Sequence, residues 1–354
     1  MTSKELKIKE FDANGLGIKG NNLFGLPFDD NEANTIVIPV PWEVTVSYSS
    51  GTANGPEAIL NASLQVDLFD PNIKDAWQSG IYMTVIDQKL RKKSDKLREK
   101  ARKIIDAMEN GIDVENDKKI LKDYQDINEA CAEMVEWVKA ETFKYLKQGK
   151  MVALLGGDHS TPLGFIKALT AIYPKFAVLQ IDAHADLRVA YEGFEYSHAS
   201  IMYNVLKEEQ VSKLVQVGIR DYCEAEAKMV TDSNGRIKTF YDADLKAAQY
   251  EGETWKKTCE KIIKELPNEV FISFDIDGLD PKLCPNTGTP VAGGFELEQI
   301  FYLVNALVKS GKKIIGFDLN EVSPGNDEWD ANVGARILYK LCNLMAVSQG
   351  KIAK

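Results

Sequence analysis

Six side chains that can bind metals follow three apolar runs of this 354-residue sequence at short spacing. They are His159, Asp182, His184, Asp186, Asp275 and Asp277. The first Asp-His-Asp group stands at alternate positions, so an extended backbone would point all three side chains to one side. The second Asp pair shares that spacing, and Gly156-Gly157 before His159 permits a tight turn. We therefore expect two imidazoles and four carboxylates to converge on one end of a sheet.

Four carboxylates this close together would repel one another, which raises their pKa values unless cations compensate. Two divalent metal ions provide that compensation, and mixed imidazole and carboxylate ligands suit Mn, Fe, Co, Ni or Zn better than Ca or Mg. Six ligands for two metals require that some carboxylates bridge. A water between two metals loses a proton near neutral pH and becomes a nucleophile. The residues alone therefore predict metal-dependent hydrolysis.

Each motif alone has a simpler interpretation. The spacing of the residues in DAHAD fits strand-end capping beside a surface histidine, and Ser160 after His159 fits a helix cap. The combination is more specific, because the sequence has only three histidines and all of them lie in one short part of the chain. Their clustering indicates a site.

Near-continuous apolar runs predict the strands that position these residues. The predicted strands span residues 35–39, 81–86, 151–155, 176–181, 214–219, 270–274 and 313–317. Helices are predicted at 127–148 and 161–172, and the charged segment 87–123 is predicted to be helical and solvated. Apolar strands that alternate with helices are typical of a mostly parallel sheet covered on both faces. We therefore expect a single-domain α/β fold of three layers, αβα, with polar residues at the carboxyl ends of its strands.

The overall composition is that of a folded, acidic protein. The chain has 43 Lys+Arg and 53 Asp+Glu, a net charge of −10, and 44% hydrophobic residues. The negative charge argues against a nucleic-acid partner, and no apolar run is long enough for a membrane span. Residues Met1 to Glu10 lack the apolar core of a signal peptide. Five cysteines without paired spacing suit a reducing compartment, so we expect a cytoplasmic protein.

These motifs resemble those of the ureohydrolase superfamily, which includes arginases, agmatinases and formimidoylglutamases. The matching segments are GTANGP at 51–56, GGDHS at 156–160, DAHAD at 182–186, VGIRD at 217–221, SFDIDGLDP at 273–281, PNTGTPVAGG at 285–294 and GFDLNEVSP at 316–324. The resemblance implies an arginase-like fold from about Ile36 onward and two divalent metal ions, usually manganese (Mn2+), with nickel (Ni2+) as an alternative. It assigns the first metal to His159, Asp182, Asp186 and Asp275. It assigns the second metal to His184, Asp182, Asp275 and Asp277.

The resemblance also implies catalytic roles for three residues. Glu321 matches the family carboxylate that binds the substrate guanidinium, and a carboxylate pairs with that planar cation through parallel hydrogen bonds. His198 matches a mobile histidine that carries protons to the leaving amine, work that suits an imidazole with a pKa near 6.5. Asp186 would accept a hydrogen bond from the attacking hydroxide. The simpler alternatives are an ordinary strand-end acid for Glu321 and a core histidine for His198.

The segment 187–196, LRVAYEGFEY, bears on the choice of substrate. It lacks the hydroxyl-rich run with which arginases hold the substrate α-carboxylate and α-amine, and it resembles the DLRxxYEGxxxSH segment of bacterial agmatinases. Glu192 and Glu195 suit a cationic tail, although a solvated surface would also account for both glutamates. We therefore expect hydrolysis of agmatine to putrescine and urea, with Glu192 among the substrate-binding residues.

Two segments enlarge the chain beyond a minimal agmatinase: an N-terminal extension at 1–34 and the charged helical insertion at about 87–123. They resemble a subgroup that includes nickel-dependent enzymes acting on free guanidine, so guanidine hydrolysis to ammonia and urea is the alternative. Formimidoylglutamase and guanidinobutyrase activities come next, and the non-enzymatic alternative is an inactive metal-binding homologue. By resemblance we also expect a homo-oligomer, either a trimer or a hexamer, whose only other partner is a small guanidino substrate.

Overall fold

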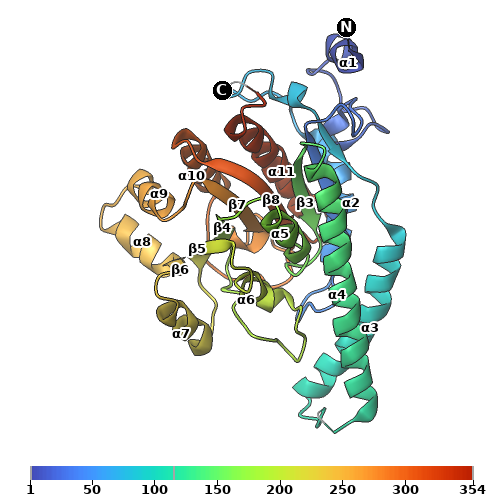
Figure 1. Cartoon of the computed structure of the whole chain (residues 1–354), viewed down its shortest axis with the longest axis vertical. Coiled ribbons are helices and arrows are strands. Elements are labelled where there is room, and N and C mark those ends of the chain that lie inside the picture. The colour runs from blue at the N-terminus through green and yellow to red at the C-terminus, as the bar shows by residue number, and fades with distance from the viewer. Residues whose placement is uncertain (1, 115, 353–354) are drawn as a thin grey trace.

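An eight-stranded parallel sheet occupies the centre of the molecule in the computed structural model, which describes residues 2–114 and 116–352 (Figure 1). The strands follow the order β2-β1-β3-β8-β7-β4-β5-β6. Their bounds are β1 Thr35–Val40, β2 Ile81–Met83, β3 Met151–Gly156, β4 Phe176–Ile181, β5 Val211–Ile219, β6 Ile237–Tyr241, β7 Glu269–Asp275 and β8 Lys313–Asn320. The side chains of β1, β3 and β4 are buried along their whole length, as expected for strands covered on both faces.

Helices cover both faces of this sheet. In the described part of the chain the α-helices are α1 Ser3–Glu10, α2 Gly55–Ala62, α3 Gln88–Glu109, α4 Lys118–Leu146, α5 Leu163–Thr170, α6 Ile201–Val205, α7 Glu224–Asp232, α8 Asp242–Tyr250, α9 Trp255–Lys264, α10 Leu297–Lys309 and α11 Trp329–Ser348. Helices α4, α5 and α6 pack in series, as do α2, α11, α10 and α9. Because crossovers between parallel strands are right-handed, the reversal of chain direction after β6 puts these two groups on opposite faces. The predicted three-layer αβα fold is therefore confirmed.

The local predictions were right about the strands in most places and less accurate about the helices. All seven predicted strands occur, although β2 ends at Met83, and β6 was not predicted because Lys238 and Thr239 interrupt its apolar pattern. Helix α4 begins at Lys118, well before the predicted start at residue 127. The Asp117 side chain caps it by accepting hydrogen bonds from backbone N–H groups of the first turn. The predicted insertion at 87–123 therefore divides between two helices. Its status as an insertion, the extension at 1–34 and the single domain stay predictions.

The carboxyl ends of the central strands form the crevice in which the predicted site residues lie. Strands β4 and β7 are neighbours, yet the helices that follow them, α6 and α10, lie on opposite faces. Such a divergence opens a crevice beyond the strand ends, where ligands bind in α/β folds. Within the described residues, no helix combines the length and the hydropathy that crossing a membrane requires.

Candidate metal centre and active site

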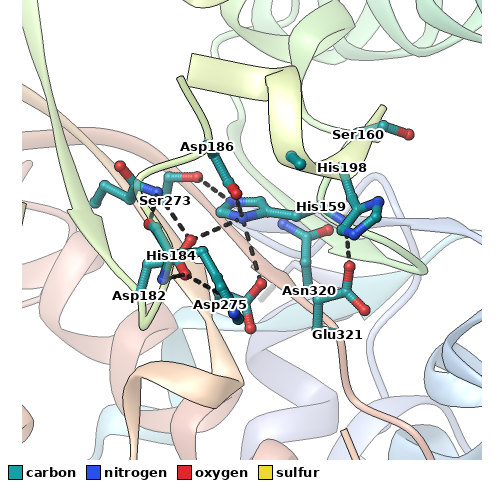
Figure 2. A network of polar contacts seen from close by, with 12 residues as sticks. His159, Ser160, Asp182, His184, Asp186, His198, Ser273, Asp275, Asn320 and Glu321 are labelled. Atoms are coloured by element: carbon teal, nitrogen blue, oxygen red, sulfur yellow. Dashed lines mark hydrogen bonds and ion pairs between the residues drawn. The ribbon is translucent and has the colours of Figure 1, made fainter. Parts of the chain in front are cut away.

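The predicted metal-binding side chains converge at this edge of the sheet, as Figure 2 shows for His159, Asp182, His184, Asp186 and Asp275. Asp277 joins them through its contact with His184. His159 follows β3, the DAHAD segment follows β4, and Asp275 and Asp277 stand at the end of β7. His159 lies at the middle of the first group. Its Nδ1 atom is 3.0 Å from Asp182 Oδ2, 3.0 Å from Asp186 Oδ2 and 3.3 Å from Asp275 Oδ2. One nitrogen therefore faces three carboxylates.

His184 belongs to a second group that overlaps with the first. Its Nδ1 atom is 3.0 Å from Asp277 Oδ2 and 3.7 Å from Asp182 Oδ1. Ligand atoms of His159, Asp182 and Asp186 lie close enough together to hold one ion, and those of Asp182, His184 and Asp277 could hold another. Asp182 is common to both groups and presents a different oxygen to each histidine. The predicted bridging role fits Asp182, and Asp275 lies between the groups: its Oδ2 atom is 3.3 Å from His159 Nδ1, and its Oδ1 atom accepts a hydrogen bond from the backbone N–H of Asp277 (2.9 Å).

The convergence does not come from the extended backbone that we expected. Strand β4 ends at Ile181, and Asp186 has a left-handed backbone with φ of 54°. Asp275 ends β7, and Asp277 already lies in the short 3-10 helix Ile276–Gly278. The prediction of alternating side chains on a continuing strand was therefore wrong for both motifs. Bends after the strand ends turn the carboxylates inward, and a left-handed Asp at a binding site is a strained conformation that the surroundings must hold.

The electrostatics of the cluster call for positive charge. Burial raises the pKa of Asp186 to about 7, with a further contribution from the charge of Asp182. Burial and the charges of Asp277 and Asp182 hold the pKa of Asp275 well above its usual range. Among the described residues, neither His159 Nδ1 nor Asp277 Oδ2 makes a hydrogen bond of regular geometry, although both are buried and each lies 3.0 Å from an oppositely charged group. Buried polar atoms without partners are costly, and a divalent cation between these oxygens and nitrogens would satisfy them.

A second set of side chains fixes how His159 presents its ring. Ser273 Oγ donates a hydrogen bond to Asp318 Oδ1 (3.1 Å), so it accepts one from His159 Nε2 (2.9 Å). Ser273 and Asp318 are register partners on β7 and β8. The carboxylates of Asp182, Asp186 and Asp275 hold the pKa of His159 well above its usual range, so without a metal both ring nitrogens carry protons. The contact with Ser273 retains the proton on Nε2, so a bound metal ion would replace the proton on Nδ1, which gives the tautomer that a metal ligand needs. Sequence reasoning gave Ser273 and Asp318 no role, because only strand pairing brings them to His159.

A row of amides holds the shared carboxylate in the same way. Gln180 Nε2 donates to Asp182 Oδ2 (2.8 Å), and Gln216 Nε2 donates to Gln180 Oε1 (2.7 Å). Thr239 Oγ1 in turn donates to Gln216 Oε1 (2.7 Å). These residues are neighbours in the register of β4, β5 and β6, so the sheet itself orients Asp182. They too were missed by sequence reasoning.

Glu321 lies directly after β8 and beside the metal-binding groups. Its Oε1 atom accepts a hydrogen bond from the backbone N–H of His159 (2.8 Å), and its Oε2 atom is buried without a partner in the described structure. A Cβ atom at Gly288 would lie 2.9 Å from Oε2, so glycine keeps the space beside this oxygen open. The carboxylate is thus held at one oxygen and available at the other.

His198 begins the short helical turn that precedes α6, and it is almost fully buried. Its Nε2 atom is 3.3 Å from Ser47 Oγ, and its Nδ1 atom is 3.3 Å from Ser197 Oγ. Burial, with the positive charges of His184 and His159, lowers the pKa of His198 from 6.5 to about 3. The expectation of a pKa near 6.5 was therefore wrong, and the imidazole is neutral at pH 7.

A cavity of about 430 Å³ opens from the metal-binding groups to the surface. The residues that line it include Ser47, Tyr48, His184, Asp186, His198 and Asp221. Glu192 is not among the residues that line it, and burial, with the charge of Glu109, raises the pKa of its half-buried carboxylate to about 7. The predicted contact of Glu192 with substrate is therefore not supported, and Asp221 is the exposed acid at this cavity. A larger cavity between α6 and α7, about 560 Å³, contains none of the predicted site residues.

The comparisons with known proteins identify the family. The sequence model of the Arginase family matches residues 33–343, so this chain belongs to the arginase family. An N(1)-aminopropylagmatine ureohydrolase of Thermus thermophilus is 29% identical over 334 residues, which cover 91% of this chain and 94% of that protein. The agmatinase of Neisseria meningitidis serogroup C is 29% identical over 343 residues, 95% of each chain. The crystal structure of a hypothetical agmatinase from Burkholderia thailandensis matches with a TM-score of 0.70 at 23% identity and covers 98% of both chains.

The predicted resemblance to the ureohydrolase superfamily and the arginase-like fold are thereby confirmed. The prediction of a metal-dependent ureohydrolase that acts on an amidine C–N bond agrees with the family and with the names of these relatives. The assignment of single residues to metal or substrate is a separate matter. It stays a prediction, supported by the geometry described above.

Proposed function

We propose that this protein hydrolyses a C–N bond of agmatine and releases urea and putrescine. The observation that carries the proposal is the overlap of two metal-binding groups at Asp182, directly beside the half-satisfied carboxylate of Glu321. The metal-binding groups provide a place for hydrolytic chemistry, and the carboxylate of Glu321 provides a binding place for a planar cation. The relatives named as agmatinase and aminopropylagmatine ureohydrolase support the same class of substrate.

The residues present fit a pair of divalent metal ions. His159, Asp182, Asp186 and Asp275 would hold one ion, and His184, Asp182, Asp275 and Asp277 would hold the other. When bound, such a pair supplies positive charge for the transition state and lowers the pKa of a water molecule toward neutrality. We propose Mn2+ as the metal, with Ni2+ as the alternative, because both accept mixed imidazole and carboxylate ligands.

Glu321 orients the substrate in this mechanism. Its Oε1 atom is fixed by the His159 backbone, and its unpartnered Oε2 atom can accept from a guanidinium N–H. A carboxylate and a guanidinium pair through parallel, charge-assisted hydrogen bonds, so the plane of the cation follows the plane of the carboxylate. The guanidinium carbon is then held at the metal-binding groups, where Asp186 accepts a hydrogen bond from the attacking water.

His198 carries the proton. Because its imidazole is neutral at pH 7, it first accepts at Nε2 a proton released by the attacking water and afterwards donates this proton to the nitrogen of the departing amine as the C–N bond breaks. The hydroxyls of Ser47 and Ser197 lie at the two ring nitrogens and keep the ring facing the cavity. In this sequence of proton transfers, His198 acts first as a base and then as an acid. A histidine that is already protonated before the reaction begins would act only as an acid.

The cavity favours a substrate with a cationic tail. Guanidine has no tail and would leave most of the 430 Å³ to water. Asp221 attracts a terminal ammonium and repels the carboxylates of 4-guanidinobutyrate and formimidoylglutamate. The arginine at the cavity, Arg188, is already engaged: its Nε atom is 4.0 Å from Glu226, and its guanidinium stacks 4.6 Å from the centre of the Tyr191 ring. A cytoplasmic homo-oligomer in polyamine metabolism, a trimer or a hexamer, completes the proposal.

Urea release tests the proposal directly. The protein would be loaded with Mn2+ or Ni2+ and given agmatine, free guanidine, 4-guanidinobutyrate, arginine and formimidoylglutamate, with ammonia followed in parallel because formimidoylglutamate yields formamide. We expect turnover of agmatine. Preference for free guanidine would overturn the choice of substrate. If the protein binds two metals per chain and releases neither urea nor ammonia from any of the five compounds, the result would support an inactive metal-binding protein instead.

A further inference from the structure

Two loops form walls of the cavity. The first loop, residues 43–54, carries Ser47 and Tyr48, and the second loop, residues 187–197, carries Arg188 and Tyr191. They meet at His198, which is bonded to Ser47 and packs edge-on against the Tyr191 ring at 6.3 Å. Neither loop contains a helix or strand longer than one short turn, so something else must hold them in place.

Helix α3 holds the first loop through side chains on one of its faces. Arg91 Nη1 donates to the backbone oxygen of Ala53 (3.0 Å), and Ser94 Oγ accepts from the backbone N–H of Glu43 (3.0 Å). Arg98 reaches furthest: its Nε atom donates to Ser50 Oγ (3.1 Å), and its Nη1 atom donates to the backbone oxygen of Val46. Positions 91, 94 and 98 are three and four residues apart, which places them in one row along the helix.

Helix α4 holds the second loop. The Tyr124 hydroxyl donates to the backbone oxygen of Glu192 (2.9 Å), and its ring packs against Phe194 with the ring centres 5.3 Å apart. Gly193 has φ of 81°, and a Cβ atom there would lie 2.6 Å from the Tyr124 ring. Asn128 adds a hydrogen bond from the backbone N–H of Glu195 to its Oδ1 atom (3.1 Å).

The two helices are fastened to each other. In Figure 1 they run side by side along one edge of the molecule. Lys100 of α3 pairs with Asp123 (2.8 Å) and Asp126 (2.6 Å) of α4. Leu97 and Ile127 are buried with the rest of the core. These contacts join the two helices, so a displacement of either one would be transmitted to both loops.

We propose that the α3–α4 pair is a brace for the two walls of the cavity, and that Arg98 and Tyr124 are positioning residues for the guanidino substrate. This inference rests on the proposed function for its kinetic consequence, although the holding of the loops does not depend on it. The charged segment 87–123, predicted to be helical and solvated without an assigned role, thus has an inner face that contacts a loop of the cavity. Glu192, predicted to contact substrate, belongs to the brace through its backbone oxygen.

Kinetics of two substitutions test the brace in the metal-loaded full chain. Arg98→Met removes two hydrogen bonds from a charged donor, so we expect KM for agmatine to rise about tenfold, and Tyr124→Phe, which removes one neutral bond, to raise it about fivefold. kcat and metal content should change less than about twofold. Arg98→Lys keeps the charge and should recover part of the loss. A merely structural role would reduce the active fraction, and hence the maximal rate, without a change in KM.

Matched controls separate the brace from the general effects of substitution. Lys93→Met removes a charge from α3 at a site where the lysine pairs with Glu133, and Tyr302→Phe removes a hydroxyl from an exposed position on α10. Both should leave KM unchanged. Equal KM effects in the controls and in the brace variants would overturn the proposal.

Hydrogen–deuterium exchange gives a readout that needs no activity. Peptides covering 43–54 should exchange faster in Arg98→Met, and those covering 187–197 faster in Tyr124→Phe, while peptides covering β3 and β4 stay as protected as in the parent chain. Unchanged exchange in both loops would overturn the brace even if urea is released. Faster exchange in a protein that releases no urea would support the brace and remove the proposed function, so the two failures are distinguishable.

Discussion

The charge state of His198 provides the sharpest test of the mechanism. Its pKa of about 3 lies far below the ordinary value of 6.5, and the difference corresponds to about 5 kcal/mol against the imidazolium. At pH 7 about one molecule in 10,000 carries the proton, compared with about a quarter for an unperturbed histidine. Bound metal ions carry charge of the same sign as the protonated histidines nearby and would not reverse this direction.

The assay is nuclear magnetic resonance of protein labelled with ¹³C-histidine, since the chain has only three histidines and His198→Asn identifies one signal by its loss. We expect the His198 signal to keep its neutral position from pH 8 down to pH 5, in the metal-free protein and in the protein loaded with diamagnetic Zn2+. A midpoint near 6.5 would refute the reasoning from burial.

The pH dependence of the free energy of unfolding provides a second test of the low pKa of His198. A histidine whose folded pKa is depressed takes up its proton first in the unfolded chain, so the free energy of unfolding falls as the pH drops below 6.5. Between pH 7 and pH 5 the parent chain should lose about 2 kcal/mol more than His198→Asn, measured by urea denaturation. Equal losses in the two proteins would show that His198 titrates in the folded state as it does in the unfolded one.

Three further substitutions test the site. Asp182→Asn should lower metal content below two ions per chain and abolish urea release, as measured by elemental analysis and a urea assay; full metal content would contradict the shared role of Asp182. Ser273→Ala should weaken metal binding about 10- to 100-fold in competition with a chelator, because the His159 ring loses its orienting partner, and unchanged affinity would argue against that tautomer. Gly288→Ala places a Cβ atom 2.9 Å from Glu321 Oε2 and should raise KM for agmatine at constant metal content; an unchanged KM would separate Glu321 from substrate binding.

The sequence predicted the strands and the gathering of the site residues because both depend on local patterns. Apolar runs marked β3, β4, β7 and β8, and parallel strands bring their carboxyl ends to one edge. The expected reason for the convergence was nevertheless wrong, since Asp186 and Asp277 lie on bends and not on extended strands. Backbone conformation after a strand end depends on tertiary contacts that spacing alone does not contain.

The supporting residues could not be predicted because they are defined by pairing between distant segments. Ser273 meets Asp318, and Gln180 meets Gln216, only in the register of the folded sheet. Arg220 is similar: it lies in a matched motif, yet its role is seen only in its hydrogen bonds to the backbone oxygens of Asp277 (2.6 Å) and Val291 (3.0 Å). The pKa of His198 depends on burial by loops that follow no repeating pattern.

The position of β8 determines when the site can form during biosynthesis. This strand comes after all the others in the chain, yet it lies between β3 and β7 in the sheet. Asp182, His184 and Asp277 follow β4 and β7, which are neighbours in the sheet, so these residues can come together without β8. His159 follows β3, and it reaches the carboxylates only once β8 lies between β3 and β7. A chain emerging from the ribosome therefore has no complete binding centre until β8 has been made, because unfolded chains rarely hold preformed metal sites. His159 therefore joins the carboxylates of β4 and β7 only when the sheet closes.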